Sequence, residues 1–313
     1  MNQIYSLGVD IGGTNTDIGL VNGTGTVISR TNLKTSQYSD PKLYVNDMVK
    51  VIKEMIKEID PNKISGVGIG APAANYYTGS IENATNLNMK GIIPLRSMIQ
   101  EQLPFQVVVT NDANAATYGE MIYGGAKGMK NFMMFTLGTG IGSGIVIDGN
   151  LVYGFDGLAG EMGHAILIPE GRPCGCGNKG CLEKYASSSG IVNNCLELMP
   201  QFPNSILTSY PYNEMTGKTV ADAAQVGDPL AIATYERTGY LLGIALANAV
   251  TFSSPEAIFL MGGPIQAGDV FLDPIKKSFL KHKLFIYNRE IPILLSSLHE
   301  NDVAILGAAA LTR

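Results

Sequence analysis

The sequence predicts an α/β protein, because short apolar strands alternate with helix-compatible stretches along most of the chain. A second observation is a repeat: the glycine-interrupted segments DIGGTNTDIGLV near the start and TLGTGIGSGIVI near the middle resemble each other. A third is length, since 313 residues suit roughly two domains. Together these features predict a chain with two similar α/β halves.

The first half begins as a hairpin meander whose glycine turn spans 12–15. Asp40 and Pro41 supply an N-cap and a preset first helical residue, and the following apolar spacing of three and four predicts a helix of about five turns that ends before Pro61. A further helix is expected over 112–121. Strands are expected at 4–11, 17–21, 26–30, 64–69 and 106–110.

The second half opens with another glycine-interrupted hairpin at Phe132, with Asp148 and Gly149 as its two-residue turn. Strands are expected at 256–261 and 291–296, and helices at 182–199, about 229–251 and 303–311. The last helix is apolar on most sides, so it should pack into a groove.

Composition excludes several classes of protein. Lys and Arg total 22 against 27 for Asp and Glu, so the formal charge is −5 and nucleic acid is not an expected partner. The N-terminal residues carry no basic or long apolar stretch, and no segment approaches the ~18 uninterrupted apolar residues of a membrane helix. We therefore expect a cytoplasmic protein without a membrane partner.

Two glycine bends are candidate phosphate-binding loops. A bend of glycines with a hydroxyl residue lets backbone N–H groups approach a phosphate, because no Cβ blocks the way. Either bend alone could equally be a tight structural turn. Neither has the Walker A or the G-x-G-x-x-G spacing. The residues of the two bends are Gly12, Gly13, Thr14 and Asn15, and Gly138, Thr139 and Gly140.

A carboxylate precedes the first bend. Asp10 ends the first strand, where it could organise Mg²⁺ on phosphates, although a solvated strand-end Asp is the alternative. A third glycine pair, Gly262 and Gly263, follows a later strand. The two bends and this pair together predict an actin-like ATPase arrangement, with a nucleotide clamped between two domains.

Cysteine and histidine gather in one segment. His164 belongs to the sequence EMGH, and Cys174, Cys176 and Cys181 follow within a glycine-rich stretch. Three thiolates and one imidazole complete a four-coordinate Zn²⁺ shell, which leaves no position for a reactive water and makes the metal structural. The alternative is three reduced cysteines in a flexible loop. Cys195, on the following helix, is expected to be a buried small hydrophobe.

Asp112 is the candidate general base. It lies in the sequence TNDAN, directly after the strand QVVVT and at the start of a helix. An Asp in this place could simply cap the helix. In a chain with two phosphate loops, however, it lies at the carboxyl end of a strand, where ligand clefts of α/β sheets form. A carboxylate there can take a proton from a substrate hydroxyl.

With these motifs in place, the chain resembles the ROK family of sugar kinases over essentially its whole length. The resemblance rests on GVDIGGTNTDIGLV, GVGIGAP, TNDANAA, FTLGTGIGSGIV, AGEMGH, CGCGNKGCLEKYAS and FLMGGPI. It implies an actin-like (ribonuclease H-like) fold with two α/β domains around a central cleft. The expected domains are a smaller one at 1–118, completed by a C-terminal helix at 300–313, and a larger one at 119–299 that carries the zinc loop.

The resemblance also implies an activity, the phosphorylation by ATP of a hexose or N-acetylhexosamine at its 6-hydroxyl, with Asp112 as general base. The implied sugar-binding residues are Asn86, Asn111, Asp112, Glu161, His164 and Glu183. Those implied for Mg-ATP are Asp10, Gly12, Gly13, Thr14, Asn15, Gly138, Thr139, Gly140, Gly262 and Gly263. The implied zinc ligands are His164, Cys174, Cys176 and Cys181.

The segments EMGH and CGCGNKGCLE look most like those of glucokinases of the family, so glucose is the expected substrate. N-acetylglucosamine or N-acetylmannosamine is the alternative, and a sugar-responsive regulator without kinase activity is a further one. Two departures concern the sugar pocket: Ala73 follows Pro72 where the family usually has glycine, and no aromatic residue follows Leu87 closely. The family also implies a homodimer or homotetramer.

Overall fold

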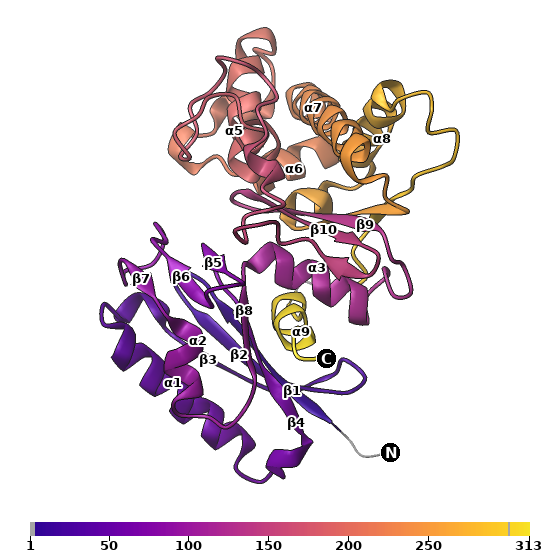
Figure 1. The fold of residues 1–313 in the computed structure, drawn as a ribbon. Helices are drawn as coiled ribbons and strands as arrows, with labels where there is room; N and C mark the ends of the chain where they lie inside the picture. The colour runs from indigo at the N-terminus through magenta and orange to yellow at the C-terminus, as the bar shows by residue number, and fades with distance from the viewer. Residues whose placement is uncertain (1–3, 300) are drawn as a thin grey trace. The chain divides into compact units, whose positions relative to one another are not determined.

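The computed structural model describes residues 4–299 and 301–313; residue 300, where the expected C-terminal segment begins, lies outside this range. The chain forms two compact units, drawn in Figure 1. The first unit comprises residues up to Met129, Gly149–Ala159 and Ser296–Arg313, and the second comprises Lys130–Asp148 and Gly160–Leu295. Residues 119–129 and 149–159 thus group with the N-terminal residues, whereas the boundary expected at 118/119 places them in the other domain.

The first unit is built on a five-stranded mixed sheet in the order β3-β2-β1-β4-β8. The first three strands are antiparallel neighbours, and β4 and β8 run parallel to β1. Their bounds are β1 (Tyr5–Ile11), β2 (Thr16–Asn22), β3 (Val27–Leu33), β4 (Ile64–Gly70) and β8 (Val107–Thr110). All five agree with the expected strands to within a few residues.

The helices of the first unit cover both faces of this sheet (Figure 1). Large apolar residues of β1 and β4, such as Leu7 and Ile69, share a buried cluster with α1 (Pro41–Ile56) and α2 (Leu95–Gln100). Because side chains alternate across a strand, Gly8 and Gly68 point to the opposite face. There they meet α9 (Val303–Ala310), which packs against α3 (Asp112–Tyr123).

A small sheet and two turns of 3-10 helix complete the first unit. The small sheet has the order β5-β6-β7, with antiparallel pairing throughout. Its strands are β5 (Ala74–Asn75), β6 (Ser80–Glu82) and β7 (Ile92–Ile93), and the 3-10 helices are η1 (Thr35–Gln37) and η2 (Pro61–Lys63).

The second unit repeats the strand pattern of the first. Its strands are β10, β9, β12 and β13, neighbours in that order, in which β9 and β10 are antiparallel and β12 is parallel to both β9 and β13. The two-residue strand β11, which follows β10 in the chain, falls in the segment Gly149–Ala159 that groups with the first unit. The predicted similarity of the two halves is therefore confirmed. The bounds are β9 (Phe132–Leu137), β10 (Ile141–Ile147), β11 (Asn150–Leu151), β12 (Ala257–Met261) and β13 (Ile293–Leu295).

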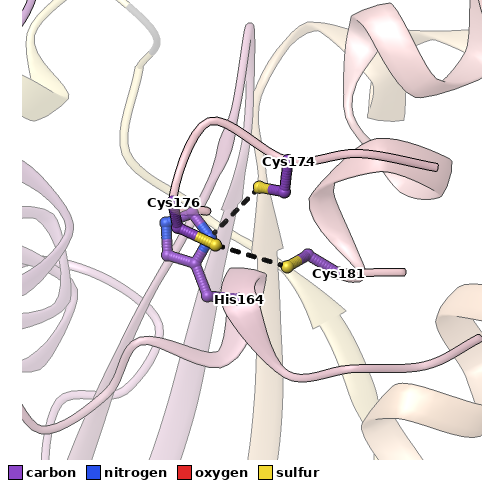
Figure 2. A group of neighbouring side chains, drawn as sticks. All are labelled: His164, Cys174, Cys176 and Cys181. Atoms are coloured by element: carbon purple, nitrogen blue, oxygen red, sulfur yellow. Dashed lines mark hydrogen bonds between the residues drawn. The ribbon is translucent and has the colours of Figure 1, made fainter. Parts of the chain in front are cut away.

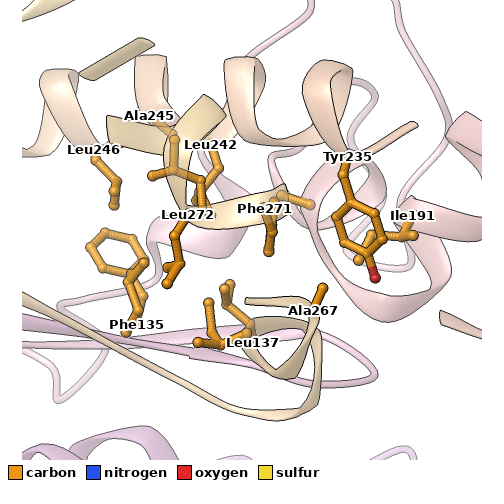
Figure 3. Packing of buried hydrophobic residues seen from close by; sticks show 14 of the residues in the cluster. Phe135, Leu137, Ile191, Tyr235, Leu242, Ala245, Leu246, Ala267, Phe271 and Leu272 are labelled. Carbon is orange, nitrogen blue, oxygen red and sulfur yellow. The ribbon is translucent and has the colours of Figure 1, made fainter. Parts of the chain in front are cut away.

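Helices pack on this second sheet through a continuous apolar core. Figure 3 shows Phe135 and Leu137 of β9 beneath Leu242 of α7 (Pro229–Ser253) and Leu272 of α8 (Asp269–His282).

None of the helices in the described part of the chain is both long and apolar enough to cross a membrane. The remaining elements are α4 (Glu183–Ala186), α5 (Ser188–Leu198), α6 (Gly217–Gln225), η3 (Met162–His164), η4 (Met199–Gln201), η5 (Ile206–Ser209), η6 (Tyr212–Glu214) and η7 (Gly263–Ala267).

One expected helix is wrong in part. The stretch 182–199 is not continuous, because Ser187 has extended backbone (ψ 173°) and ends α4. Its hydroxyl accepts a hydrogen bond from the N–H of Gly190 at 3.1 Å and so begins α5 as an N-cap. The helices α2, α6 and α8 were not expected from the sequence.

Candidate functional site

The first glycine bend is a tight turn that lies against Asn86. The N–H of Gly12 donates to the carbonyl of Asn15 at 2.9 Å and closes the bend. A Cβ on Gly13 would lie only 2.6 Å from the carbonyl oxygen of Asn86, so glycine is required for this approach. Thr14 and Asn15 are exposed. The structure therefore brings Asn86 to the first candidate phosphate loop.

Asp10 and Asp112 lie on the same face of the first sheet. A Cβ on Gly70 would lie 3.9 Å from Oδ1 of Asp10 and 3.6 Å from Cα of Asp112. Burial is the largest cause that raises the pKa of Asp10 to about 6, and the negative charges of Asp112 and Asp17 contribute to the same rise. A group of carboxylate oxygens that repel one another suits a hard divalent cation, so the donor set fits Mg²⁺.

The helix-capping alternative considered for Asp112 belongs instead to its neighbour. Asn111 is the N-cap of α3, and its Oδ1 accepts the N–H of Asn114 at 2.7 Å. Asp112 occupies the first turn and is exposed, with its Oδ1 near the N–H of Ala113 at 2.8 Å. Asn111 therefore satisfies the helix end, and the Asp112 carboxylate faces solvent.

A stacked pair of tyrosines that contacts the strand before Asp112 was missed from the sequence. The rings of Tyr76 and Tyr153 stack with centroids 3.8 Å apart, and the hydroxyl of Tyr153 is hydrogen-bonded to the side chain of Thr110. Thr110 comes two residues before Asp112. The tyrosines lie on β-hairpin and loop segments without a recognisable motif, so only the contact to Thr110 marks them as part of the site.

The second glycine bend joins β9 to β10, and two other predicted elements contact its ends. The N–H of Gly138 donates to the carbonyl of Gly140 at 2.9 Å, and the N–H of Ile141 donates to Oε2 of Glu183 at 3.2 Å. Gly262 follows β12 with φ +115°, and a Cβ there would lie 2.0 Å from the carbonyl oxygen of Leu137. The structure thus brings Glu183 and the Gly262-Gly263 pair to the second candidate phosphate loop.

The predicted metal ligands converge, as Figure 2 shows. Nδ1 of His164 lies 3.6 Å from Sγ of Cys174, and Sγ of Cys176 lies 3.6 Å from Sγ of Cys181. The four donor atoms all lie within 4.8 Å of one another. Tetrahedral Zn²⁺ with Zn–S bonds of about 2.3 Å separates two sulfurs by about 3.8 Å, so the cluster fits zinc. Cys195 is fully buried, as expected.

His164 can serve the metal and a ligand at once. It ends η3, whose N-cap Glu161 accepts the N–H of His164 through its carbonyl at 3.0 Å. Because Nδ1 faces the sulfurs, Nε2 is left with an N–H to donate elsewhere. Glu161 is exposed and lies three residues before His164, which places a carboxylate beside the metal ligand.

The predicted site residues divide between the units. Asp10, the first bend, Asn86, Asn111 and Asp112 belong to the first unit. The second unit holds Gly138, Thr139, Gly140, Glu161, His164, Glu183, Gly262, Gly263 and the three cysteines of the cluster. Each unit therefore presents one glycine bend with acidic or amide side chains next to it.

Comparison with known proteins agrees with this architecture. The sequence profile of the ROK family matches residues 6–313. A glucokinase of Halalkalibacterium halodurans is 34% identical over 320 residues, which cover 100% of this chain and 96% of that protein. A xylose repressor of Bacillus spizizenii is 29% identical, covering 96% of this chain and 75% of its own length. A crystal structure of a ROK family glucokinase from Streptomyces griseus, in complex with glucose and AMPPNP, superposes with a TM-score of 0.80 at 30% identity and 98% coverage of both chains.

The fold and its two glycine bends define a member of the actin-like α/β class. Within that class, the chain belongs to the ROK family.

Proposed function

We propose that this protein transfers the γ-phosphate of ATP to the 6-hydroxyl of glucose, with Asp112 as general base. The chain is an ATP-dependent sugar kinase: it is 34% identical to a glucokinase, and its structural relative from Streptomyces griseus binds glucose and AMPPNP. The observation that carries the proposal for the base is the exposed Asp112 carboxylate at the start of α3, two residues after β8 and close to Asp10.

Asp112 would accept the proton of the 6-hydroxyl as that oxygen attacks the γ-phosphate. General base catalysis of this kind contributes about 10² to 10⁴ in rate. Catalysis of phosphoryl transfer depends mainly on positioning and charge neutralisation. The proposed sugar-binding and nucleotide-binding residues would therefore hold the 6-hydroxyl in line with the γ-phosphate. The sugar hydroxyls would be bound by Asn86, Asn111, Glu161, His164 and Glu183.

The nucleotide would use both glycine bends. Asp10 would organise Mg²⁺, which neutralises phosphate charge when bound. The backbone N–H groups of the bends would donate hydrogen bonds to the phosphates, and the pair Gly262 and Gly263 would lie next to the adenosine. The residues proposed for the phosphates are Gly12, Gly13, Thr14, Asn15, Gly138, Thr139 and Gly140.

Zinc would be structural. With His164, Cys174, Cys176 and Cys181 all used as ligands, the metal has no position for a reactive water. Its role would be to fix His164 so that Nε2 donates to a sugar hydroxyl, and to hold the loop that leads to Glu183.

Finer proposals and two alternatives accompany the activity. The protein acts in the cytoplasm, as a homodimer or homotetramer, without nucleic acid or membrane partners. N-acetylglucosamine or N-acetylmannosamine is the alternative acceptor. The 29% identity to a xylose repressor makes a sugar-responsive regulator the second candidate function.

The test is ADP release by the zinc-loaded protein with Mg-ATP and glucose, N-acetylglucosamine, N-acetylmannosamine, mannose or fructose. We expect turnover on glucose and a loss of about 10² to 10⁴ in kcat for Asp112→Asn. Glu58→Gln, which neutralises an exposed carboxylate in the turn after α1, is the control and should be fully active. Turnover on another sugar but not on glucose would make that sugar the substrate. Full activity of Asp112→Asn would overturn the assignment of Asp112 as general base. No turnover on any of the sugars would favour the second candidate function, a sugar-responsive regulator.

A further inference from the structure

Ile141, the first residue of β10, is held at its backbone N–H by the segment that follows the metal ligands. Its N–H donates to Oε2 of Glu183 at 3.2 Å. A Cβ on Gly140 would lie 2.5 Å from the same oxygen, so the carboxylate lies directly on the glycine bend. The other end of the bend is held by the same segment, because the N–H of Ser188 donates to the carbonyl of Gly138 at 2.9 Å.

The carbonyl group of Ile141 is held from a second direction. A Cβ on Gly163 would lie 2.1 Å from the carbonyl oxygen of Ile141, so the two backbones are in direct contact. No positive φ requires glycine at Gly163 or Gly140. The close approaches of Glu183 and of the Ile141 carbonyl explain glycine at these two positions instead.

Both residues that hold Ile141 are close neighbours of metal ligands in the chain. Gly163 directly precedes His164, and Glu183 follows Cys181 by two residues. Between the two segments run a bridge from Ile166 to Cys181 and a hydrogen bond from the N–H of Leu182 to the carbonyl of Ala165 at 2.9 Å. A metal bound to His164 and Cys181 would cross-link these segments at the point where they contact the bend.

We propose that Glu183 and Gly163 transmit metal occupancy to the second glycine bend, so that zinc sets the conformation of the loop that contacts the nucleotide. Glu183 is then a positioning residue for the nucleotide loop as well as a sugar ligand. A carboxylate has two oxygens, so Oε1 can accept a hydrogen bond from a sugar hydroxyl while Oε2 accepts the N–H of Ile141. The nucleotide part of this inference rests on the proposed kinase function, whereas the coupling of metal to bend does not.

The first experiment measures hydrogen exchange of the full chain, by mass spectrometry on peptides that cover 138–146, without sugar or nucleotide. Glu183→Ala removes the acceptor and Glu183→Gln keeps one through its amide oxygen. Lys179→Ala is the matched control, since it removes only an exposed ion pair with Glu170 within the metal loop. We expect about tenfold faster exchange in zinc-loaded Glu183→Ala, and wild-type exchange in Glu183→Gln and Lys179→Ala.

Removal of zinc from the wild type by a chelator should raise exchange of the same peptides by a similar factor. A peptide covering 64–70, in the sheet of the first unit, reports whether the protein remains folded. Unchanged exchange at 138–146 in zinc-loaded Glu183→Ala overturns the proposal, as does faster exchange in Lys179→Ala to the same extent. These outcomes do not depend on any kinase activity.

The second experiment uses the reciprocity of coupled sites. If zinc sets the bend, AMPPNP bound without sugar should tighten zinc binding, measured at equilibrium by competition with a chromophoric chelator, by the same factor by which zinc removal weakens AMPPNP binding. Calorimetry gives the binding change, and we expect about fivefold or more. Equal AMPPNP affinity with and without zinc, in protein whose bend does respond to zinc, overturns the nucleotide part alone.

Discussion

Tyr153 stacks on Tyr76 with ring centroids 3.8 Å apart and ring planes 8° from parallel. Its hydroxyl reaches the side chain of Thr110, at the end of the strand that leads to Asp112. Burial raises the pKa of Tyr153 above its ordinary value despite this hydrogen bond, so the phenol stays protonated at neutral pH. We therefore expect the pair to support the candidate base by packing and hydrogen bonding.

Substitution of Tyr153 should separate these two contributions. Tyr153→Phe keeps the stack and loses the hydrogen bond, so we expect kcat to fall about threefold with little change in stability. Tyr153→Ala also loses the stacked pair and should lower the free energy of unfolding by about 1–3 kcal/mol. Tyr77→Phe, which loses only a hydrogen bond to the carbonyl of Gly154, is the control. Steady-state kinetics and urea unfolding check the result, and wild-type kcat in Tyr153→Phe would contradict it.

Asp10 should make the stability of the protein fall as pH rises. Its folded pKa of about 6 lies above the ordinary carboxyl value, so the folded state binds the proton more tightly than the unfolded state does. The stabilisation is complete below about pH 4 and is lost as pH rises through about 6. Asp10→Asn should therefore unfold like wild type at pH 4 and be more stable by roughly 3 kcal/mol at pH 7.5.

The measurement is urea unfolding from pH 4 to 8 without divalent cations, because a bound cation would offset the carboxylate charges. Glu58→Gln serves as the control, since that carboxylate is exposed in the turn after α1. An equal pH dependence of Asp10→Asn and wild type would show that Asp10 titrates normally.

Zinc content should depend on Cys181 but not on Cys195. Cys181→Ala removes one of four converging ligands, so we expect zinc to fall from one per chain to near zero. The unfolding temperature should drop by about 5 °C or more, because metal binding stabilises only the folded loop. Cys195→Ala removes a buried thiol on α5 outside the cluster and should retain zinc. Elemental analysis measures the zinc content and calorimetry the unfolding temperature. One zinc ion per chain in Cys181→Ala would exclude the predicted ligand set.

Gly68 should be intolerant of any side chain, because α9 packs directly on it. A Cβ on Gly68 would lie 1.8 Å from the carbonyl oxygen of Ala308. We expect Gly68→Ala to push α9 from the sheet, to cost about 2 kcal/mol or more, and to expose the C-terminal helix to proteases. In Gly23→Ala the nearest atom would lie 3.7 Å away, so that variant should resemble wild type. Urea unfolding and limited proteolysis test this, and equal stability of the two variants would rule it out.

Much of the fold was predictable because its signals are local. The strands that flank both glycine bends follow from short apolar runs, and the N-cap of α1 is where Asp40 was expected. The break at Ser187 was not predictable, since the residues on either side continue a helix-compatible pattern and only the cap of α5 interrupts it. The helix α8 was also missed: Pro274 lies inside it, although Phe271, Ile275 and Phe279 recur every four residues. The domain boundaries and the roles of the site residues stay predictions.

The sequence by itself determined the features that lie within a few residues of one another: the two glycine bends, the donor set of the metal cluster, and an Asp at the end of a strand. Only the tertiary structure decided which of these meet. Asp10 lies near Asp112 because β1, β4 and β8 run parallel and place their ends at one edge, and Glu183 reaches Ile141 because two distant segments pack together. Such contacts depend on sheet order and close backbone packing, which no local pattern of residues encodes.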